Sequence, residues 1–270
     1  MNLTDTHAHL YWEDFKEDFD EVIKRAINAG ITTIINVGVE VEKSKEALRQ
    51  VQGKLANIPG LKVYSTIGIH PHESSTFSYD QIEQLEQIYL SDPKTVVAVG
   101  ECGLDYYENN NYNDYKGHNV YNLKNKQKAL FKAQINLAKK IKLPLIVHCR
   151  QAWDDTIEMT KDHFGIYHCY SGLPHTTNYI LQTTNFLVSF AGNLTYPKND
   201  YLREAAKLLP LERIVLETDC PFLPPQSKRG QRNEPANMLE IAQLVAELKG
   251  VSLDEVATQT TENVVRSFAL

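Results

Sequence analysis

Short runs of β-branched residues alternate with amphipathic stretches from one end of the chain to the other, and this alternation limits the possible fold more than any other feature. The short apolar runs predict buried strands, and the longer stretches with an apolar stripe predict helices. The predicted strands are 2–6, 32–38, 63–69, 95–101, 144–149, 166–170, 186–191 and 214–219. The predicted helices are 15–29, 42–56, 79–91, 123–142, 153–164, 176–184, 200–209, 236–249 and 253–268.

Eight strands that are each followed by a helix are the pattern of a closed (β/α)8 TIM barrel of the α/β class. An open doubly wound sheet is the alternative, but it usually carries a glycine-rich phosphate loop. No GxGxxG or GxxxxGK[ST] string follows any predicted strand. A length of 270 residues suits one such barrel, and the chain shows no internal repeat or composition shift. We therefore expect a single domain over 1–270.

Composition narrows the class of protein further. The net charge of −6 argues against a surface that coats nucleic acid broadly, although a nucleic-acid substrate could still be gripped locally through metal ions. No apolar run approaches the roughly 20 residues that span a bilayer, and the N-terminus lacks a basic-then-apolar signal peptide. We expect a cytoplasmic protein with no membrane partner, and the sequence leaves its oligomeric state unknown.

Polar residues collect where the predicted strands end, which is the face at which such barrels carry their chemistry. In the opening stretch Asp5-Thr6-His7-Ala8-His9, alternate side chains of an extended strand share one face. A lone HxH is also typical of an exposed terminus, but several buried, unpaired polar groups would be costly, and a shared divalent cation offsets that cost. Four imidazoles and two carboxylates suffice for two ions with positions left for water. The candidate ligands are His7, His9, Glu101, His148, His168 and Asp219.

The four cysteines each follow one of these candidate ligands directly. Because neighbouring side chains of a strand point to opposite faces, we expect the cysteines to pack as small apolar residues between sheet and helices. A zinc site built from all four is the alternative, but no CxxC spacing supports it. The cysteines are Cys102, Cys149, Cys169 and Cys220.

The motifs DTHAHL, GIHPH, GECGLD, HCR, HCYSG, ETDCPFL and RGQRNEP follow one another along the whole chain, which resembles the TatD family of metal-dependent hydrolases in the amidohydrolase superfamily. The resemblance implies a TIM barrel and a metal-dependent deoxyribonuclease, often a 3′–5′ exonuclease, acting on DNA or an oligonucleotide. By position, the family's ligands fall on the six residues above. Glu101 takes the bridging place that a carbamylated lysine fills in many superfamily relatives. We expect two divalent ions per chain, and the mixed nitrogen and oxygen ligands suit zinc, manganese or magnesium.

The expected mechanism is metal-assisted hydrolysis, in which paired cations lower the pKa of a bound water and polarise a phosphoryl oxygen. Glu101 and Asp219 are the expected catalytic carboxylates. Asp219, the carboxylate of the last strand, would be both ligand and proton acceptor, with a purely passive ligand as the alternative.

Residues beside the ligand motifs are the expected substrate contacts. His72 and Arg150 could bind phosphate oxygens, and the loop after the eighth strand is where barrels often bind phosphate. His70 is expected to be a packed loop residue and not a ligand. Any of the expected contacts could instead be structural. They are His72, Arg150, Arg229, Asn233 and Glu234.

Two other functions remain open. Activated water also attacks carbonyl carbon, so the chain could hydrolyse another ester, such as D-aminoacyl-tRNA, an activity proposed within this family. The second is a non-catalytic metal-binding scaffold, which the intact ligand set argues against.

The segment 106–122 is much longer than the usual βα loop of about 2–6 residues. Its five tyrosines and six asparagines predict a lid or wall that grips unpaired nucleotides, and a surface insertion without a role is the alternative.

Overall fold

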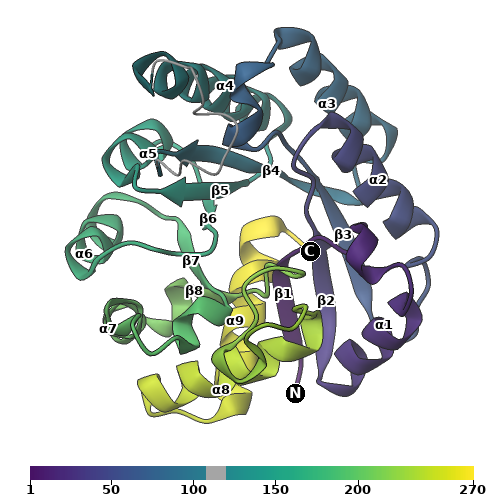
Figure 1. The fold of residues 1–270 in the computed structure, drawn as a ribbon, viewed down its shortest axis with the longest axis vertical. Coiled ribbons are helices and arrows are strands. Elements are labelled where there is room, and N and C mark those ends of the chain that lie inside the picture. Colours follow the sequence, from purple (N-terminus) through teal and green to yellow (C-terminus); the bar gives the residue numbers. More distant parts are fainter. Residues whose placement is uncertain (108–119) are drawn as a thin grey trace.

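The predicted strands form one sheet in which every strand pairs in parallel with the next along the chain. The structure is a computed structural model, and it describes residues 1–107 and 120–270. The last strand returns to the first through a parallel bridge between Ala8 and Cys220 and a 2.8 Å hydrogen bond from Asp219 N to His7 O. The sheet is therefore closed into a barrel, and the predicted (β/α)8 fold is confirmed (Figure 1). The strands are β1 Leu3–Ala8, β2 Ile31–Asn36, β3 Lys62–Ile67, β4 Val96–Asp105, β5 Leu145–Arg150, β6 Gly165–Tyr167, β7 Leu187–Phe190 and β8 Ile214–Leu216.

Helices surround the strands, as Figure 1 shows. Their apolar stripes pack on the outer face of the sheet in one large hydrophobic cluster. The sequence signals for helix ends match the structure: Ser252 accepts a hydrogen bond from Glu255 N at the start of the last helix. Gly250 ends the preceding one with φ 67°, where glycine is favoured. The helices are α1 Phe19–Asn28, α2 Val41–Gln52, α3 Tyr79–Ser91, α4 Val120–Ile141, α5 Trp153–Thr160, α6 Pro174–Thr183, α7 Asp200–Leu208, α8 Met238–Lys249 and α9 Leu253–Phe268.

A second, smaller hydrophobic cluster joins inward-facing strand residues to α9. Val264 and Phe268 of α9 pack with Ile146, Ile166 and Val215 of the strands. Helix α9 lies beside β1 in Figure 1, so the C-terminal helix contributes to this inner core. The opposite ends of the strands are left for polar side chains.

Strand β5 shows how the pleat selects these side chains. Leu145 and Val147 belong to the outer cluster, whereas Ile146 belongs to the inner one. Because side chains alternate along a strand, His148 follows Ile146 into the barrel, and Cys149 follows Val147 out of it. The alternation thus places an imidazole at the mouth of the barrel.

The cysteine prediction can be checked in the same way. Cys102, Cys149 and Cys220 are buried in the outer cluster, as predicted. Cys169 differs, because it is partly exposed and its backbone has a φ of 44°. None of the candidate metal-ligand groups within the described residues contains a cysteine, so the four-cysteine zinc site has no support.

Two further sequence expectations concern loops and membranes. Residues 108–119 of the predicted lid at 106–122 lie outside the described residues. In the described part of the chain, none of the helices has the length and hydropathy needed to cross a bilayer.

Candidate metal centre

All six predicted ligands meet at the carboxyl ends of the strands, and each lies close to at least one of the others. Three overlapping groups bring their ligand atoms within 4.8 Å. Glu101, which is 5% exposed, belongs to two of these groups, and His7 belongs to two as well. The groups are His7 with His168 and Asp219, His7 with His9 and Glu101, and His70 with Glu101 and His148.

One side of the cluster comes from β1 and from the residues that follow β8. His7 Nε2 and His9 Nε2 lie 3.2 Å apart. Two nitrogens that bind one zinc ion tetrahedrally at about 2.0–2.1 Å are separated by about 3.3 Å. Asp219 Oδ1 lies 3.7 Å from His7 Nε2 and 3.5 Å from His9 Nε2. These three side chains therefore have the spacing of ligands around a single ion.

The other side comes from β5 and from the residue that follows β6. His148 Nδ1 and His168 Nε2 each lie 3.0 Å from Glu101 Oε1. The second oxygen of the same carboxylate, Oε2, faces the first side, 3.4 Å from His7 Nε2 and 4.0 Å from His9 Nε2. Glu101 thus presents one oxygen to each pair of imidazoles.

Close backbone approach joins β4, which carries Glu101, to β5, which carries His148. Gly103 in β4 has a φ of 139°, and a Cβ atom there would lie 2.0 Å from the carbonyl oxygen of His148. Only glycine lets β4 approach β5 this closely beside a candidate ligand.

The protonation of three imidazoles is fixed by groups behind them. His9 Nδ1 donates to the carbonyl oxygen of Val37 at 2.9 Å, which leaves Nε2 with a free lone pair. His168 Nδ1 lies 3.2 Å from Glu217 Oε1, and His148 Nε2 lies 3.2 Å from Asp105 Oδ2. Carboxylates that hold the second nitrogen of an imidazole are the usual partners of metal-binding histidines.

His70 is partly buried beside the cluster, and its two ring nitrogens have roles opposite to those in His9. Its Nδ1 accepts a hydrogen bond from His72 N at 3.2 Å, so the neutral ring carries its proton on Nε2, 3.4 Å from Glu101 Oε1. Burial lowers the pKa of His70 to about 4, which keeps the ring neutral. His70 therefore offers Glu101 an N–H group and no lone pair, which favours the predicted packing role.

The electrostatics of the cluster follow from its burial. Desolvation opposes ionisation of Glu101 most strongly, but the neighbouring imidazoles, His168 above all, outweigh it and hold the pKa of Glu101 well below its usual range. Burial likewise opposes the charge of Asp219, and His9 and His7 lower its pKa. For His168 burial lowers the pKa, but Glu217 and Glu101 outweigh that effect and hold it well above the usual value.

The donor set fits divalent cations. Glu101, Asp219 and Glu217 have only imidazoles as basic partners within residues 1–107 and 120–270. His168 Nε2 is buried and makes no hydrogen bond, despite its short distance to Glu101 Oε1. Buried carboxylates without Lys or Arg partners are costly, and a bound cation would balance them.

Three of the five predicted substrate contacts, His72, Arg150 and Arg229, lie against other polar or aromatic side chains. His72 Nε2 lies 3.0 Å from Asp105 Oδ2, next to the centre. Arg150 stacks on the ring of Tyr107, with 3.6 Å between Cζ and the ring centroid. Arg229 is exposed and stacks on Tyr196, with 4.5 Å between Cζ and the ring centroid.

The remaining two predicted contacts, Asn233 and Glu234, form hydrogen bonds with other parts of the protein. Asn233 is fully buried, and its amide donates to the carbonyl oxygens of Thr218 and Phe222 at 2.8 and 2.7 Å. Glu234 forms two hydrogen bonds with Arg25 of α1, at 2.8 and 2.7 Å. These contacts favour a structural role over the expected substrate role.

Two residues with a direct bearing on the centre were absent from the predicted site, namely Glu217 and Asp105. Both stood inside quoted motifs, ETDCPFL and GECGLD. The available signal was their spacing: Glu217 follows the inward-facing Val215 by two positions, so the pleat directs it inward too.

Comparisons with known proteins agree with this geometry. Residues 4–269 match the family described as TatD related DNase. YabD of Bacillus subtilis, an uncharacterised metal-dependent hydrolase, is 34% identical over 273 residues, which cover 99% of each chain. A protein of Erwinia tasmaniensis named 3′–5′ ssDNA/RNA exonuclease TatD is 33% identical over 279 residues, which cover 100% of this chain and 98% of the relative.

A solved structure gives the same result. The crystal structure of YJJV, a TatD homologue from Escherichia coli K12, superimposes with a TM-score of 0.86 at 28% identity, covering 99% of this chain and 98% of that one. The barrel and its buried imidazoles and carboxylates are those of a metal-dependent hydrolase. This chain belongs to the TatD family, within the amidohydrolase superfamily, as its motifs predicted.

Proposed function

We propose that this protein is a deoxyribonuclease of the 3′–5′ exonuclease type, which cleaves phosphodiester bonds with two divalent ions. The observation that carries the proposal is the position of Glu101, whose two carboxylate oxygens face two separate pairs of imidazoles. Two-ion sites suit phosphodiester cleavage because charge develops on both the attacking and the leaving oxygen. The exonuclease name carried by the Erwinia relative supports the choice of substrate.

Each ion would have its own ligands, with Glu101 shared. His7, His9 and Asp219 would hold one ion, and His148 and His168 the other. When bound, magnesium, manganese or zinc would supply Lewis acidity and lower the pKa of a water molecule. The rings of His9, His148 and His168 are already oriented by their second nitrogens, so each has to give up a proton but need not turn before it binds an ion.

Asp219 is the group we assign as proton acceptor. Its Oδ1 faces His7 and His9, whereas its Oδ2 makes no hydrogen bond within the described residues. The side chain is 14% exposed, so a water molecule can reach Oδ2. Because the pKa of Asp219 is lowered, the carboxylate is ionised at neutral pH and can accept a proton from the attacking water.

The substrate would be held locally. A chain with a net charge of −6 does not attract DNA over its whole surface, so recognition must rest on the ions and on nearby donors such as Arg150. A guanidinium can give phosphate oxygens two parallel hydrogen bonds.

The test is a metal-reconstituted activity panel. Protein stripped of metal and reloaded with magnesium, manganese or zinc would be assayed on single-stranded DNA, duplex DNA, RNA, a diester reporter and a D-aminoacyl ester. A 5′-labelled oligonucleotide should yield a ladder that shortens from its 3′ end, and an inverted 3′-terminal linkage should block it. Metal analysis should approach two equivalents per chain, and Glu101→Ala should lose metal from both sides.

The competing functions predict different results. Cleavage of the D-aminoacyl ester without cleavage of any oligonucleotide would overturn the nuclease proposal and leave a hydrolase of another ester. Two bound ions with no turnover on any substrate would favour the scaffold. A Glu101→Ala protein with full metal content would contradict the shared ligand.

A further inference from the structure

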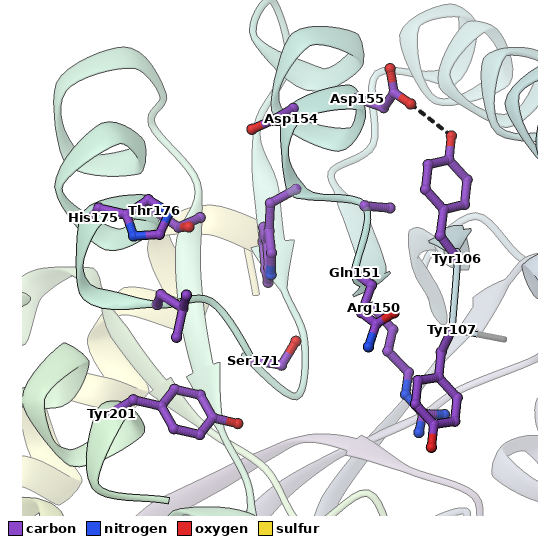
Figure 2. A pocket seen from close by; sticks show the side chains of 13 residues that line it. Tyr106, Tyr107, Arg150, Gln151, Asp154, Asp155, Ser171, His175, Thr176 and Tyr201 are labelled. Atoms are coloured by element: carbon purple, nitrogen blue, oxygen red, sulfur yellow. Dashed lines mark hydrogen bonds between the residues drawn. The ribbon is translucent and has the colours of Figure 1, made fainter. Parts of the chain in front are cut away.

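A cavity of about 590 Å³ opens at the carboxyl end of β5, and Arg150 is the one lining residue that the proposed function already involves (Figure 2). Two of its lining residues closely follow candidate ligands along the chain. Arg150 lies two positions after His148, and Ser171 lies three positions after His168. The volume lies within the range of small-molecule pockets, about 300–1,000 Å³.

One wall of this cavity is an anchored aromatic ring. Trp153, at the start of α5, packs against Tyr167 and Tyr170 with ring centroids 5.6 and 4.8 Å apart. Both tyrosines are fully buried, so they hold the indole in place from behind. A fixed indole that borders a cavity is a stacking surface for a planar ligand.

The opposite wall carries a cation without an anionic partner. Within residues 1–107 and 120–270, the guanidinium of Arg150 makes no hydrogen bond or ion pair, and it rests on Tyr107. Asp155, in the same wall, is already neutralised by Lys128 at 2.8 Å and by a 2.8 Å hydrogen bond from Tyr106. The cavity therefore has an unused positive charge at the side nearest His148.

Hydroxyl groups complete the lining. Figure 2 shows Ser171, Tyr201 and Arg150 reaching the cavity from three different elements. Tyr201 belongs to α7, and Ser171 follows β6 and donates to the carbonyl oxygen of Cys149 at 3.2 Å. A sugar hydroxyl or the polar edge of a base would find partners here.

We propose that this cavity binds the terminal nucleotide of the substrate strand, with its base against Trp153 and its phosphate hydrogen-bonded to Arg150. This inference rests on the proposed nuclease function and gives it a specificity site. An aromatic surface, hydroxyl groups and a free guanidinium next to the metal centre together match a nucleoside monophosphate. The cavity has room for one nucleotide, and in a 3′–5′ exonuclease that nucleotide is the terminal one.

The experiment measures binding directly and does not require turnover. The chain holds two tryptophans, so Trp12→Phe leaves Trp153 as the single indole reporter. Metal-loaded Trp12→Phe protein would be titrated with deoxyadenosine 5′-monophosphate and with deoxyadenosine. Both should quench Trp153 emission, and the nucleotide should bind more tightly because it reaches Arg150. Calorimetry on the protein with both tryptophans would check the affinities.

Arg150→Ala in the same background should weaken nucleotide binding by about 10- to 100-fold, the effect of losing hydrogen bonds to a charged group. Nucleoside binding should stay unchanged, and Arg150→Lys should retain part of the nucleotide affinity. Arg49→Ala, which removes an exposed guanidinium on α2, is the matched control and should bind like the parent.

The failure of this inference can be told apart from that of the proposed function. If neither ligand changes Trp153 emission, the cavity is not the nucleotide site. The same conclusion follows if Arg150→Ala and Arg150→Lys bind nucleotide like the parent while oligonucleotides are still degraded. If the binding results hold but no nucleic acid is hydrolysed, the cavity assignment stands and the nuclease proposal fails.

Discussion

The imidazoles of the metal centre depend on side chains that would never touch an ion. Glu217 Oε1 lies 3.2 Å from His168 Nδ1 and also accepts a hydrogen bond from Cys169 N at 2.6 Å. Asp105 Oδ2 contacts both His148 and His72. Each carboxylate fixes which nitrogen of a ring carries the proton, and it raises the basicity of the other nitrogen.

Two substitutions of Glu217 distinguish the effect of its charge from the effect of its hydrogen bonds. Glu217→Gln keeps an oxygen that can accept from His168 and Cys169, whereas Glu217→Ala removes it. We expect metal affinity to fall by about 10- to 100-fold in Glu217→Ala and by less in Glu217→Gln. Calorimetric zinc titrations of both variants would measure this order, and equal affinities in both variants and the parent would contradict the orienting role.

Asp219→Asn tests the proton acceptor. The substitution preserves the shape of the side chain but removes its basicity, so kcat should fall by about two to four orders of magnitude. Because substrate contacts stay in place, KM should change far less. Steady-state kinetics on single-stranded DNA, with metal content measured in parallel, would check this expectation. Near-normal turnover would reduce Asp219 to a replaceable ligand.

At the scale of elements, the segment after β8 is held by internal hydrogen bonds and not by packing alone. Asn233 joins the backbone at Thr218 and Phe222, on both sides of Asp219. Arg232 and Glu234 then tie the same segment to α1 through Asp18 and Arg25. The position of Asp219 thus depends on Asn233, which lies 14 residues later in the chain.

Asn233→Ala should destabilise the fold by about 1–3 kcal/mol, because two buried carbonyl groups lose their partner. Metal affinity should fall as well, since Asp219 loses support. Urea denaturation and zinc titration would measure the two effects. Asn178→Ala, on an exposed position of α6, is the control and should change neither. Unchanged stability in Asn233→Ala would show that water replaces the lost amide.

Apolar periodicity was sufficient to predict the elements, because it reports directly which face of a strand or helix is buried. The predicted helix 79–91 coincides with α3, and the predicted helix 253–268 coincides with α9. Several predicted strand ends were wrong: β1 and β4 continue to Ala8 and Asp105, whereas two other strands end early for a physical reason. Strands β6 and β8 stop at Tyr167 and Leu216, earlier than predicted, because Cys169 and Asp219 take positive φ values of 44° and 56°.

The metal centre was predictable only in part, because a sequence shows which residues stand at strand ends but not which side chains they contact. Histidine and carboxylate at strand ends are visible in the sequence, and all six candidate ligands do come together. Hydrogen-bond partners depend on how strands stagger, which a single sequence does not reveal. Asn233 was expected to contact substrate for this reason, although it is fully buried.

At the scale of the whole molecule, the barrel and the centre are stabilised by different forces. The inner and outer hydrophobic clusters enclose the sheet on both faces and contain none of the candidate ligands. Burial of apolar surface is the dominant favourable contribution to folding, and it does not depend on ions. We therefore expect the barrel to fold without metal.

Removal of metal by a chelator should leave the far-ultraviolet circular dichroism spectrum unchanged and lower the Tm. Bound metal at about 100 times its Kd stabilises the folded state by about 2.7 kcal/mol, and for a chain of this size each kcal/mol shifts Tm by about 2–4 °C. Calorimetric melting before and after chelation would measure the shift. Loss of helical signal on chelation would mean that the ions organise the fold itself.

A single carboxylate between two pairs of imidazoles also makes the two halves of the centre thermodynamically dependent on each other. Glu101 carries one negative charge, so a cation on either side reduces the attraction left for the next. The coupling free energy is reciprocal: whichever half fills first, it changes the affinity of the other by the same factor. Titration with metal should then depart from two independent isotherms, and the half-loaded state becomes a species with its own population, set by the free metal concentration.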